Sequence, residues 1–153
     1  MKRKLIFYLV TFTVIILVLT LQGFLTLWSI RLNLTLLPVY MIALKRGTND
    51  GLITGVFTGF LEDMLSGGFI GPSLLGKGLS GLFTSYVPLL FYYWRPFVGI
   101  SALFLFTLFD DLVVYLSLSL FSGQPVPLND FLPLAMGRAL FNAPVGLFLK
   151  YKT

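Results

Sequence analysis

Long runs of apolar residues, separated by short polar or glycine-containing segments, extend along almost the whole chain. A bilayer core about 30 Å thick is crossed by about 20 apolar residues in helical form, so these runs predict membrane-spanning helices. The sequence therefore predicts an all-α, polytopic membrane protein with one domain, residues 1–153, and about six transmembrane helices. The predicted spans cover residues 5–28, 34–46, 48–65, 74–93, 97–121 and 131–149.

The length of one predicted span and the ends of two others need comment. The segment 34–46 is short, since about a dozen residues at about 1.5 Å each do not cross the bilayer core. It is expected to tilt, to borrow residues from the preceding turn, or to re-enter the membrane. The fourth span ends in an aromatic and basic segment, residues 91–96, which is typical of a membrane interface. Pro72 is expected to lie in the glycine-rich loop 66–73 as a helix breaker.

Composition supports the membrane prediction and removes several kinds of chemistry. Hydrophobic residues make up 57% of the chain and charged residues only 11%, well below the roughly 25% of a typical soluble domain. The chain has no Cys and no His, which removes thiol nucleophiles, imidazole bases and the usual zinc or haem ligands. We therefore expect no cofactor, no metal and no acyl-transfer catalysis.

The distribution of basic residues predicts the topology. With the N-terminus in the cytoplasm, eight basic residues flank the spans on the cytoplasmic side and only Arg31 flanks them outside, so both termini are expected inside. Because these residues flank apolar runs, the net charge of +5 is interpreted as a topology signal and no nucleic-acid partner is expected. The apolar stretch 5–21 exceeds the usual signal-peptide core of roughly 7–15 residues and lacks a cleavage site, which favours an uncleaved first span. The eight residues are Lys2, Arg3, Lys4, Lys45, Arg46, Arg95, Lys150 and Lys152.

Four glycines recur every fourth residue in the third predicted span: Gly47, Gly51, Gly55 and Gly59. Residues four apart lie on one face of a helix, so the glycines form a strip that another helix can approach closely. That helix is either a neighbour in the same bundle or the transmembrane helix of a partner protein.

A second group of polar residues surrounds the loop between the third and fourth spans. Glu62 and Asp63 end the third span and Lys77 begins the fourth, so pairing of Lys77 with either carboxylate would offset the cost of charge near hydrocarbon. The pattern predicts a polar rim at the outer surface, either a structural ion pair or the mouth of an outward cavity. Ser66, Gly67 and Gly71 belong to the same rim.

The third group lies near the middle of the last two spans. Asp110 and Asp111 in the fifth span and Arg138 in the sixth are within about one helical turn in depth, which predicts an intramembrane ion pair. Adjacent residues of a helix point about 100° apart, so Arg138 is expected to hold only one of the two carboxylates. The other carboxylate is expected to find another donor, to become protonated or to face water.

A resemblance to a known family rests mainly on residues 34–85. The segments LNLTLLPVYMIALKRG and GVFTGFLEDMLSGGFIGPSLLGKGLSGLF resemble the bacterial rod shape-determining protein MreD family, which shows a G-F-x-x-D-x-x-S-G-like segment, a glycine-containing loop and an L-x-K/T-x-x-x-G-like helix start. The matching positions here are Gly59, Phe60, Asp63, Ser66, Gly67, Gly71, Leu75, Lys77 and Gly81.

The resemblance implies a non-enzymatic scaffold of the cell-elongation machinery in the bacterial cytoplasmic membrane. The implied partners are an MreC-like protein, a RodA-type glycosyltransferase with its penicillin-binding transpeptidase, the MreB cytoskeleton and membrane lipid. The family is similar to the six-helix substrate-binding S components of energy-coupling-factor transporters, so a vitamin-binding S component is the alternative. An ion or proton transporter using the two aspartates and Arg138 is a third, weaker possibility. The absence of Ala and Gly from residues 5–21 argues against the S component, whose first helix often carries a small-residue docking motif.

Overall fold

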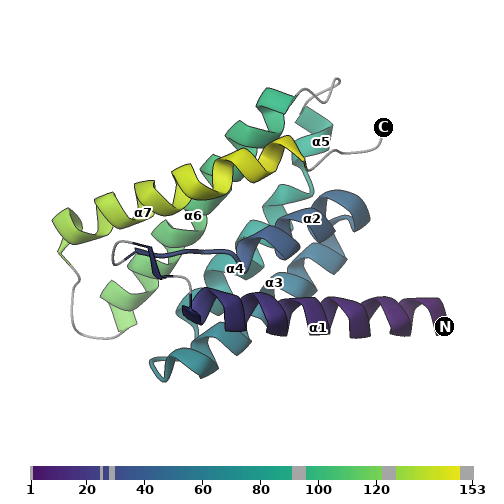
Figure 1. Cartoon of the computed structure of the whole chain (residues 1–153), viewed down its shortest axis with the longest axis horizontal. Helices are drawn as coiled ribbons and strands as arrows, with labels where there is room; N and C mark the ends of the chain where they lie inside the picture. The colour runs from purple at the N-terminus through teal and green to yellow at the C-terminus, as the bar shows by residue number, and fades with distance from the viewer. Residues whose placement is uncertain (1, 25, 28–29, 91–95, 122–126, 149–153) are drawn as a thin grey trace.

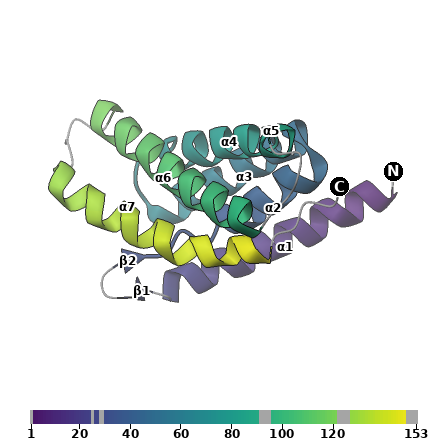
Figure 2. The ribbon, with the colours of Figure 1, turned by 90° about the horizontal axis from the view of Figure 1, so that it is seen from above.

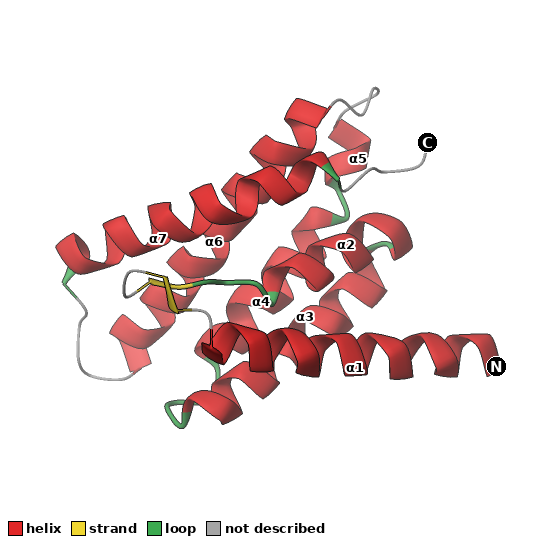
Figure 3. Cartoon of the chain, in the orientation of Figure 1, coloured by secondary structure: helices red, strands yellow, loops and turns green. Residues whose placement is uncertain are grey.

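A computed structural model describes residues 2–24, 26–27, 30–90, 96–121 and 127–148. The described part of the chain is all-α apart from one very short hairpin, as the hydropathy pattern predicts (Figures 1 and 3). Two short elements continue the longer helices: α5 (Val87–Leu90) follows α4, and the 3-10 helix η1 (Ala143–Leu147) follows α7. The six α-helices of eleven or more residues are α1 (Lys2–Phe24), α2 (Leu36–Arg46), α3 (Thr48–Ser66), α4 (Pro72–Thr84), α6 (Pro96–Phe121) and α7 (Leu128–Asn142).

The first helix is shorter than predicted. It ends at Phe24, and the strands β1 (Thr26–Leu27) and β2 (Ile30–Arg31) pair in antiparallel fashion directly after it. Gly23 weakens the last helical turn, and the β-branched Thr26 and Ile30 favour extended backbone. The prediction of one helix from 5 to 28 is therefore wrong at its end. Trp28, the last residue of the predicted span, lies outside the described residues.

Prolines explain the other differences. Pro72 is the first residue of α4 and not a loop residue, because its missing N–H would be unsatisfied at the start of a helix in any case. Pro88 and Pro144 cannot donate to the preceding helical turn, and α4 and α7 end four and two residues before them. The predicted single helices 74–93 and 131–149 are therefore each divided in two; residues 91–93 and 149 lie outside the described part.

The glycine strip packs inside the bundle. A Cβ at Gly51, Gly55 or Gly59 would overlap the carbonyl oxygen of Gly81, Lys77 or Ser73 respectively, so the α3 backbone lies directly against α4. Of the two occupants considered for this strip, the helix of the same bundle is the one observed, and docking of a partner helix on these three glycines is contradicted. Gly47 does not belong to the strip: it forms the α2–α3 turn, with a φ of 90°.

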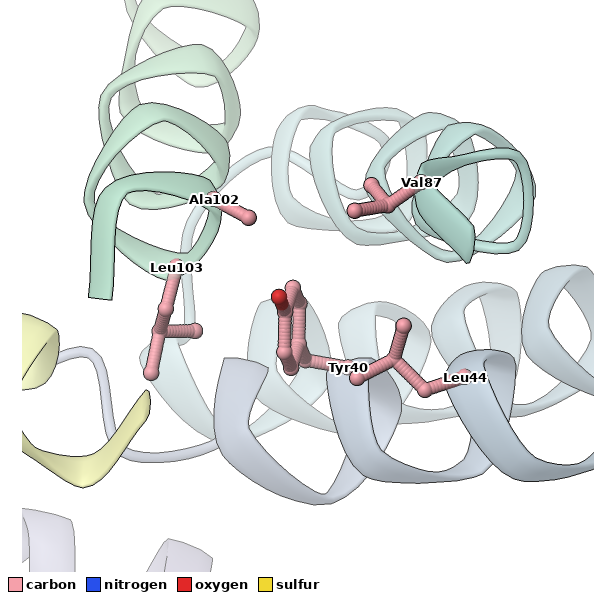
Figure 4. Packing of buried hydrophobic residues seen from close by; sticks show 5 residues of the cluster. All are labelled: Tyr40, Leu44, Val87, Ala102 and Leu103. Carbon is pink, nitrogen blue, oxygen red and sulfur yellow. The ribbon is translucent and has the colours of Figure 1, made fainter. Parts of the chain in front are cut away.

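A small apolar core lies between α2, α5 and α6. Tyr40 and Leu44 of α2 face Val87 of α5 and the α6 residues Ala102 and Leu103 (Figure 4). All five side chains are buried. α6 and α7 run side by side in both views (Figures 1 and 2), and η1 packs against α6. This core joins α2 to α6 and leaves the middle of the bundle to polar side chains.

The outside of the described structure carries many large apolar side chains. In the span Ile6–Phe24 of α1 only 6% of the residues of the most apolar window are buried, and in Phe97–Phe121 of α6 33% are buried. These two helices are long and apolar enough to cross a membrane by themselves. α2 and α4, with 11 and 13 residues, are shorter than the roughly 20 residues that a crossing requires.

Candidate functional site

Asp63 connects α3 to the start of α4. Its Oδ2 accepts hydrogen bonds from the backbone N–H groups of Gly71 (2.9 Å) and Leu74 (3.1 Å), and its Oδ1 accepts one from Ser73 (3.0 Å). The first N–H groups of a helix have no partner within that helix, so a carboxylate there satisfies them and complements the helix dipole. Gly67, with a φ of 66°, ends α3 and allows the chain to return to α4. This geometry gives a structural role to the aspartate of the segment GFLEDMLSG.

Lys77 extends from α4 into the middle of the bundle. Its Nζ lies 2.8 Å from Glu62 Oε2 on α3 and 3.4 Å from Asp110 Oδ2 on α6. The Lys77 residue is 1% exposed and Asp110 is fully buried, so both charges depend on one another. Gly55 and Gly76 make this possible, because they allow α3 and the Asp110 carboxylate respectively to approach the α4 backbone.

Residues of the segment between α1 and α2 complete the hydrogen bonds of this group. Asn33 donates through Nδ2 to Asp110 Oδ2 (2.6 Å), and Thr35 donates through its hydroxyl to Glu62 Oε2 (2.8 Å). Gln22, near the end of α1, donates to Glu62 Oε1 (2.9 Å) and accepts the backbone N–H of Thr35 (3.2 Å). The end of α1 and the segment after the hairpin therefore bring three amide and hydroxyl side chains to the buried charges.

The ion pair predicted between the last two long helices is present. Arg138 Nη1 of α7 lies 3.0 Å from Asp111 Oδ1 of α6. Asn33 Nδ2 is 3.5 Å from the same oxygen, so Asn33 contacts both aspartates. Asn142, one turn after Arg138, donates to the backbone carbonyl of Asn33 (2.9 Å) and to Thr107 (3.4 Å). We call the connected side chains the polar network: Gln22, Asn33, Thr35, Glu62, Lys77, Asp110, Asp111, Arg138 and Asn142.

The network borders a cavity of about 440 Å³, which we call the polar cavity. All five charged side chains of the network line it, together with Asp63 and apolar residues such as Leu19 and Val114. A volume in this range is typical of small-molecule sites, which span about 300–1,000 Å³. In the part of the chain that the structure describes, no three acidic, His or Cys residues are arranged to hold a metal ion.

The structure joins two sites that the sequence treats as separate. Lys77 pairs with Glu62, one of its two predicted partners, while Asp63 caps α4. The prediction of a rim at the surface is wrong in part, because Asp63 and Lys77 are only 3% and 1% exposed. The Ser66 hydroxyl donates a hydrogen bond to the backbone carbonyl of Asp63 (2.8 Å). Gly71 is the residue directly before α4, and Gly67 is the residue directly after α3. The Asp111–Arg138 pair and the residues predicted as a rim belong to one buried group, connected by Lys77 and Asp110.

Sequence reasoning did not assign Gln22, Asn33 and Thr35 to this site. A signal was present: each is a polar residue next to or within an apolar run, at the end of the first span or the start of the second. Their contacts span 40, 77 and 27 residues along the chain, and no short motif encodes such distances.

A second concave surface lies between α4–α5 and α6. It has a volume of about 980 Å³ and is almost entirely apolar. We call it the lateral groove. Its α6 wall includes Phe97, Ser101, Leu105 and Phe109, which recur every fourth residue on one face of the helix.

Comparison of the chain with protein-family models, with curated proteins and with solved structures finds no match. The fold and the site define the class of protein as an all-α bundle with an apolar exterior and a buried network of charged side chains.

Proposed function

We propose that the chain is a multi-pass membrane protein with its helical bundle embedded in lipid. The main support is the distribution of polar and apolar side chains, which is the reverse of that in a water-soluble protein. Lys77, Asp110 and Asp111 are buried inside the bundle, whereas large apolar side chains such as Phe24, Leu105 and Leu120 are 83%, 62% and 75% exposed. Charged residues in membrane proteins face the interior of the bundle and pair with one another, while the lipid-facing surface is apolar. The six-helix, N-in and C-in arrangement, similar to that of S components, is part of the same proposal.

We further propose that the protein is a non-enzymatic scaffold of the bacterial cell-elongation machinery, as the resemblance of residues 34–85 to the MreD family implies. The observation that supports this is the role of the resembling residues in one unit. Gly59 allows α3 to touch α4, Asp63 caps α4, Gly67 and Gly71 form the connection, and Lys77 reaches the polar network. The segment that resembles the family is therefore the structural centre of the fold.

The partners of this scaffold would be an MreC-like protein, a RodA-type glycosyltransferase with its transpeptidase, and, directly or indirectly, MreB, in the cytoplasmic membrane. Because α4 fills the glycine strip, we place the single transmembrane helix of the MreC-like partner in the lateral groove. The groove follows α6 from Phe97 to Phe109, about 18 Å at about 1.5 Å per residue, which is the shape that a helix lying along α6 fills. Ser101 and Ala102 are small residues in its wall, and such residues let helices approach closely in lipid.

Co-purification of an MreC-like protein encoded in the same genome tests the scaffold function. Ser101→Trp fills the lateral groove at an exposed position and should reduce co-purification at least tenfold, without loss of membrane insertion. Leu140→Trp is the matched control, since Leu140 is 62% exposed on α7 and does not line the groove. If wild-type protein retains no MreC-like partner, the scaffold proposal is wrong. If both variants retain it equally, the groove is not the docking site.

A vitamin-binding S component remains the alternative, and the polar cavity is the observation that favours it. Its volume of about 440 Å³ suits a small ligand. Thermal unfolding with riboflavin, folate or biotin separates the two proposals, since only a vitamin-binding protein gains stability by mass action from one of these ligands. A clear stabilisation by one vitamin would replace the scaffold as the main function.

A further inference from the structure

We propose that the polar cavity binds the primary ammonium group of a ligand beside Asp111. The first observation is the charge of the cavity wall. Glu62, Asp110 and Asp111 contribute three negative charges, and Lys77 and Arg138 contribute two positive charges. With these five side chains ionised, the described part of the wall carries one surplus negative charge, and an uncompensated charge is costly on side chains as buried as those of Asp110 and Asp111.

Asp63 also lines the cavity, but its charge is already engaged. Both of its oxygens accept backbone N–H groups at the positive end of the α4 dipole. The surplus therefore belongs to the group of five side chains.

The second observation is an unused hydrogen-bond acceptor. Asp111 is 3% exposed, its Oδ1 faces Arg138, and its Oδ2 has no hydrogen-bond partner. Oδ1 of Asp110 also lacks a partner, but it faces α4, since a Cβ at Gly76 would lie 2.5 Å from it. Asp111 lines the polar cavity, and its Oδ2 is the buried acceptor without a partner that we assign to the ammonium group of the ligand.

An ammonium group fits these requirements better than a metal ion. It carries one positive charge and three N–H donors, so it matches both the surplus negative charge and the unpartnered carboxylate oxygen. A metal ion requires several ligands at short distance, and the described residues offer no group of three acidic, His or Cys side chains so arranged. The ligand reaches the wall beside the two charged side chains that remain partly exposed, Glu62 at 22% and Arg138 at 27%.

Primary ammonium groups occur both in free amines and in the headgroup of phosphatidylethanolamine. The test uses the full chain purified in detergent, with ethanolamine as the probe and neutral N-acetylethanolamine as its control. A second arm compares nanodiscs of phosphatidylethanolamine with nanodiscs of phosphatidylglycerol. The readout is the unfolding midpoint against probe concentration, from which an apparent Kd follows.

Asp111→Asn removes the surplus charge and should weaken the apparent Kd at least about tenfold, which corresponds to about 1.4 kcal/mol. Asp130→Asn is the matched control, because Asp130 is exposed at the start of α7 and does not line the cavity. Gly23→Leu is a second test that leaves the charges intact. Gly23 lines the cavity and has no atom within 4 Å of an added Cβ, so the larger side chain occupies cavity space and should also weaken binding.

Stabilisation by ethanolamine, lost in Asp111→Asn and Gly23→Leu, identifies a free amine as the ligand. Stabilisation only in phosphatidylethanolamine nanodiscs, with the same loss, identifies the lipid headgroup. The proposal is overturned if neither source stabilises the wild type, or if N-acetylethanolamine acts as well as ethanolamine. It is also overturned if both variants respond as the wild type does. The polar cavity is separate from the lateral groove, so these outcomes leave the co-purification test unaffected.

Discussion

Lys77 carries the only buried ammonium group among the described residues, and three helices are arranged around it. Its partners, Glu62 and Asp110, come from α3 and α6. Removing a charge from water costs several kcal/mol, and an ion pair recovers this only when its partners and hydrogen bonds are complete. Asn33 and Thr35 supply those hydrogen bonds. The network is therefore expected to specify how the three helices fit together.

Replacement of Lys77 by Met should strongly destabilise the protein. The substitution leaves the Asp110 carboxylate buried without its cation, and removing one partner of a buried pair typically costs about 3–5 kcal/mol. Adding Asp110→Asn should recover a substantial part of the loss, since the residual partner Glu62 is 22% exposed. Thermal unfolding in detergent measures both effects, with the exposed Lys45→Met as control. An unfolding midpoint unchanged in Lys77→Met would contradict the buried ion pair.

The Asp111–Arg138 pair should be weaker than the Lys77 pairs. Arg138 is 27% exposed and so less buried than Lys77, and each single replacement should cost about 1–3 kcal/mol. The charge-swapped protein, with Asp111→Arg and Arg138→Asp, should be more stable than the sum of the two single changes predicts. The comparison of four unfolding curves gives this coupling directly. Strictly additive losses would mean that the two side chains do not interact.

The five charged residues of the site were evident from the sequence, but three of its uncharged polar residues and the connections between the side chains were not. The depth argument predicted that either Asp110 or Asp111 pairs with Arg138, because residues of similar depth on consecutive antiparallel helices lie close together, and the structure shows that Asp111 does. The same argument separated Lys77 from Asp110, since it compared only consecutive spans. Which face of α4 points at α6 depends on the packing of Gly76 against Asp110, and a sequence pattern does not give this rotation.

At the scale of helices, the contact between α3 and α4 depends on small residues from both. Gly51, Gly55 and Gly59 face Gly81, Lys77 and Ser73, so a four-residue period on one helix meets a four-residue period on the other. In the lipid environment that we propose, apolar burial does not drive helices together, and such close backbone contact would supply the packing energy. Asp63 then fixes the end of the contact by capping α4.

Gly55→Ala should destabilise the bundle, because the new Cβ would overlap the Lys77 carbonyl and force α3 away from α4. The expected loss is about 1–3 kcal/mol, the usual cost of overpacking. Gly68→Ala is the matched control: its nearest neighbour would be Ser66 Oγ at 3.6 Å, so its unfolding midpoint should stay close to that of the wild type. Equal midpoints for the two variants would show that α3 and α4 do not touch at Gly55. Replacement of Gly55 by Leu is accordingly a test of folding and not of partner binding.

Helix boundaries that depend on local sequence could be predicted, whereas a boundary without a local pattern could not. The limits of α3 and α6 agree with prediction within one residue, since long apolar runs and flanking Gly or Pro determine them locally. The divisions before Pro88 and Pro144 could also have been predicted from the proline chemistry. The hairpin after α1 could not, because two residues per strand leave no periodic pattern to detect.

At the scale of the whole molecule, several turns and helix ends lie on two opposite sides of the bundle. The start of α1, the α2–α3 turn and the end of η1 lie towards one side, and the α3–α4 loop and the β1–β2 hairpin lie towards the other (Figure 1). This arrangement is compatible with the predicted topology, in which the basic residues Lys45 and Arg46 at the end of α2 stay in the cytoplasm and the loop after Ser66 faces outward.

Cysteine labelling tests that topology with little background, because the chain contains no cysteine. Asn49→Cys places a thiol at the exposed start of α3, and Gly68→Cys places one in the exposed α3–α4 loop. In intact cells, a membrane-impermeant maleimide reaches only the outer face of the cytoplasmic membrane. It should label the thiol at 68 and not the thiol at 49. After disruption of the membrane, both should react to the same extent, which controls for local accessibility. Labelling of 49 alone in intact cells would reverse the orientation. Equal labelling of both would mean that the two ends of α3 lie on the same side of the membrane, and the embedded six-helix arrangement would then be wrong.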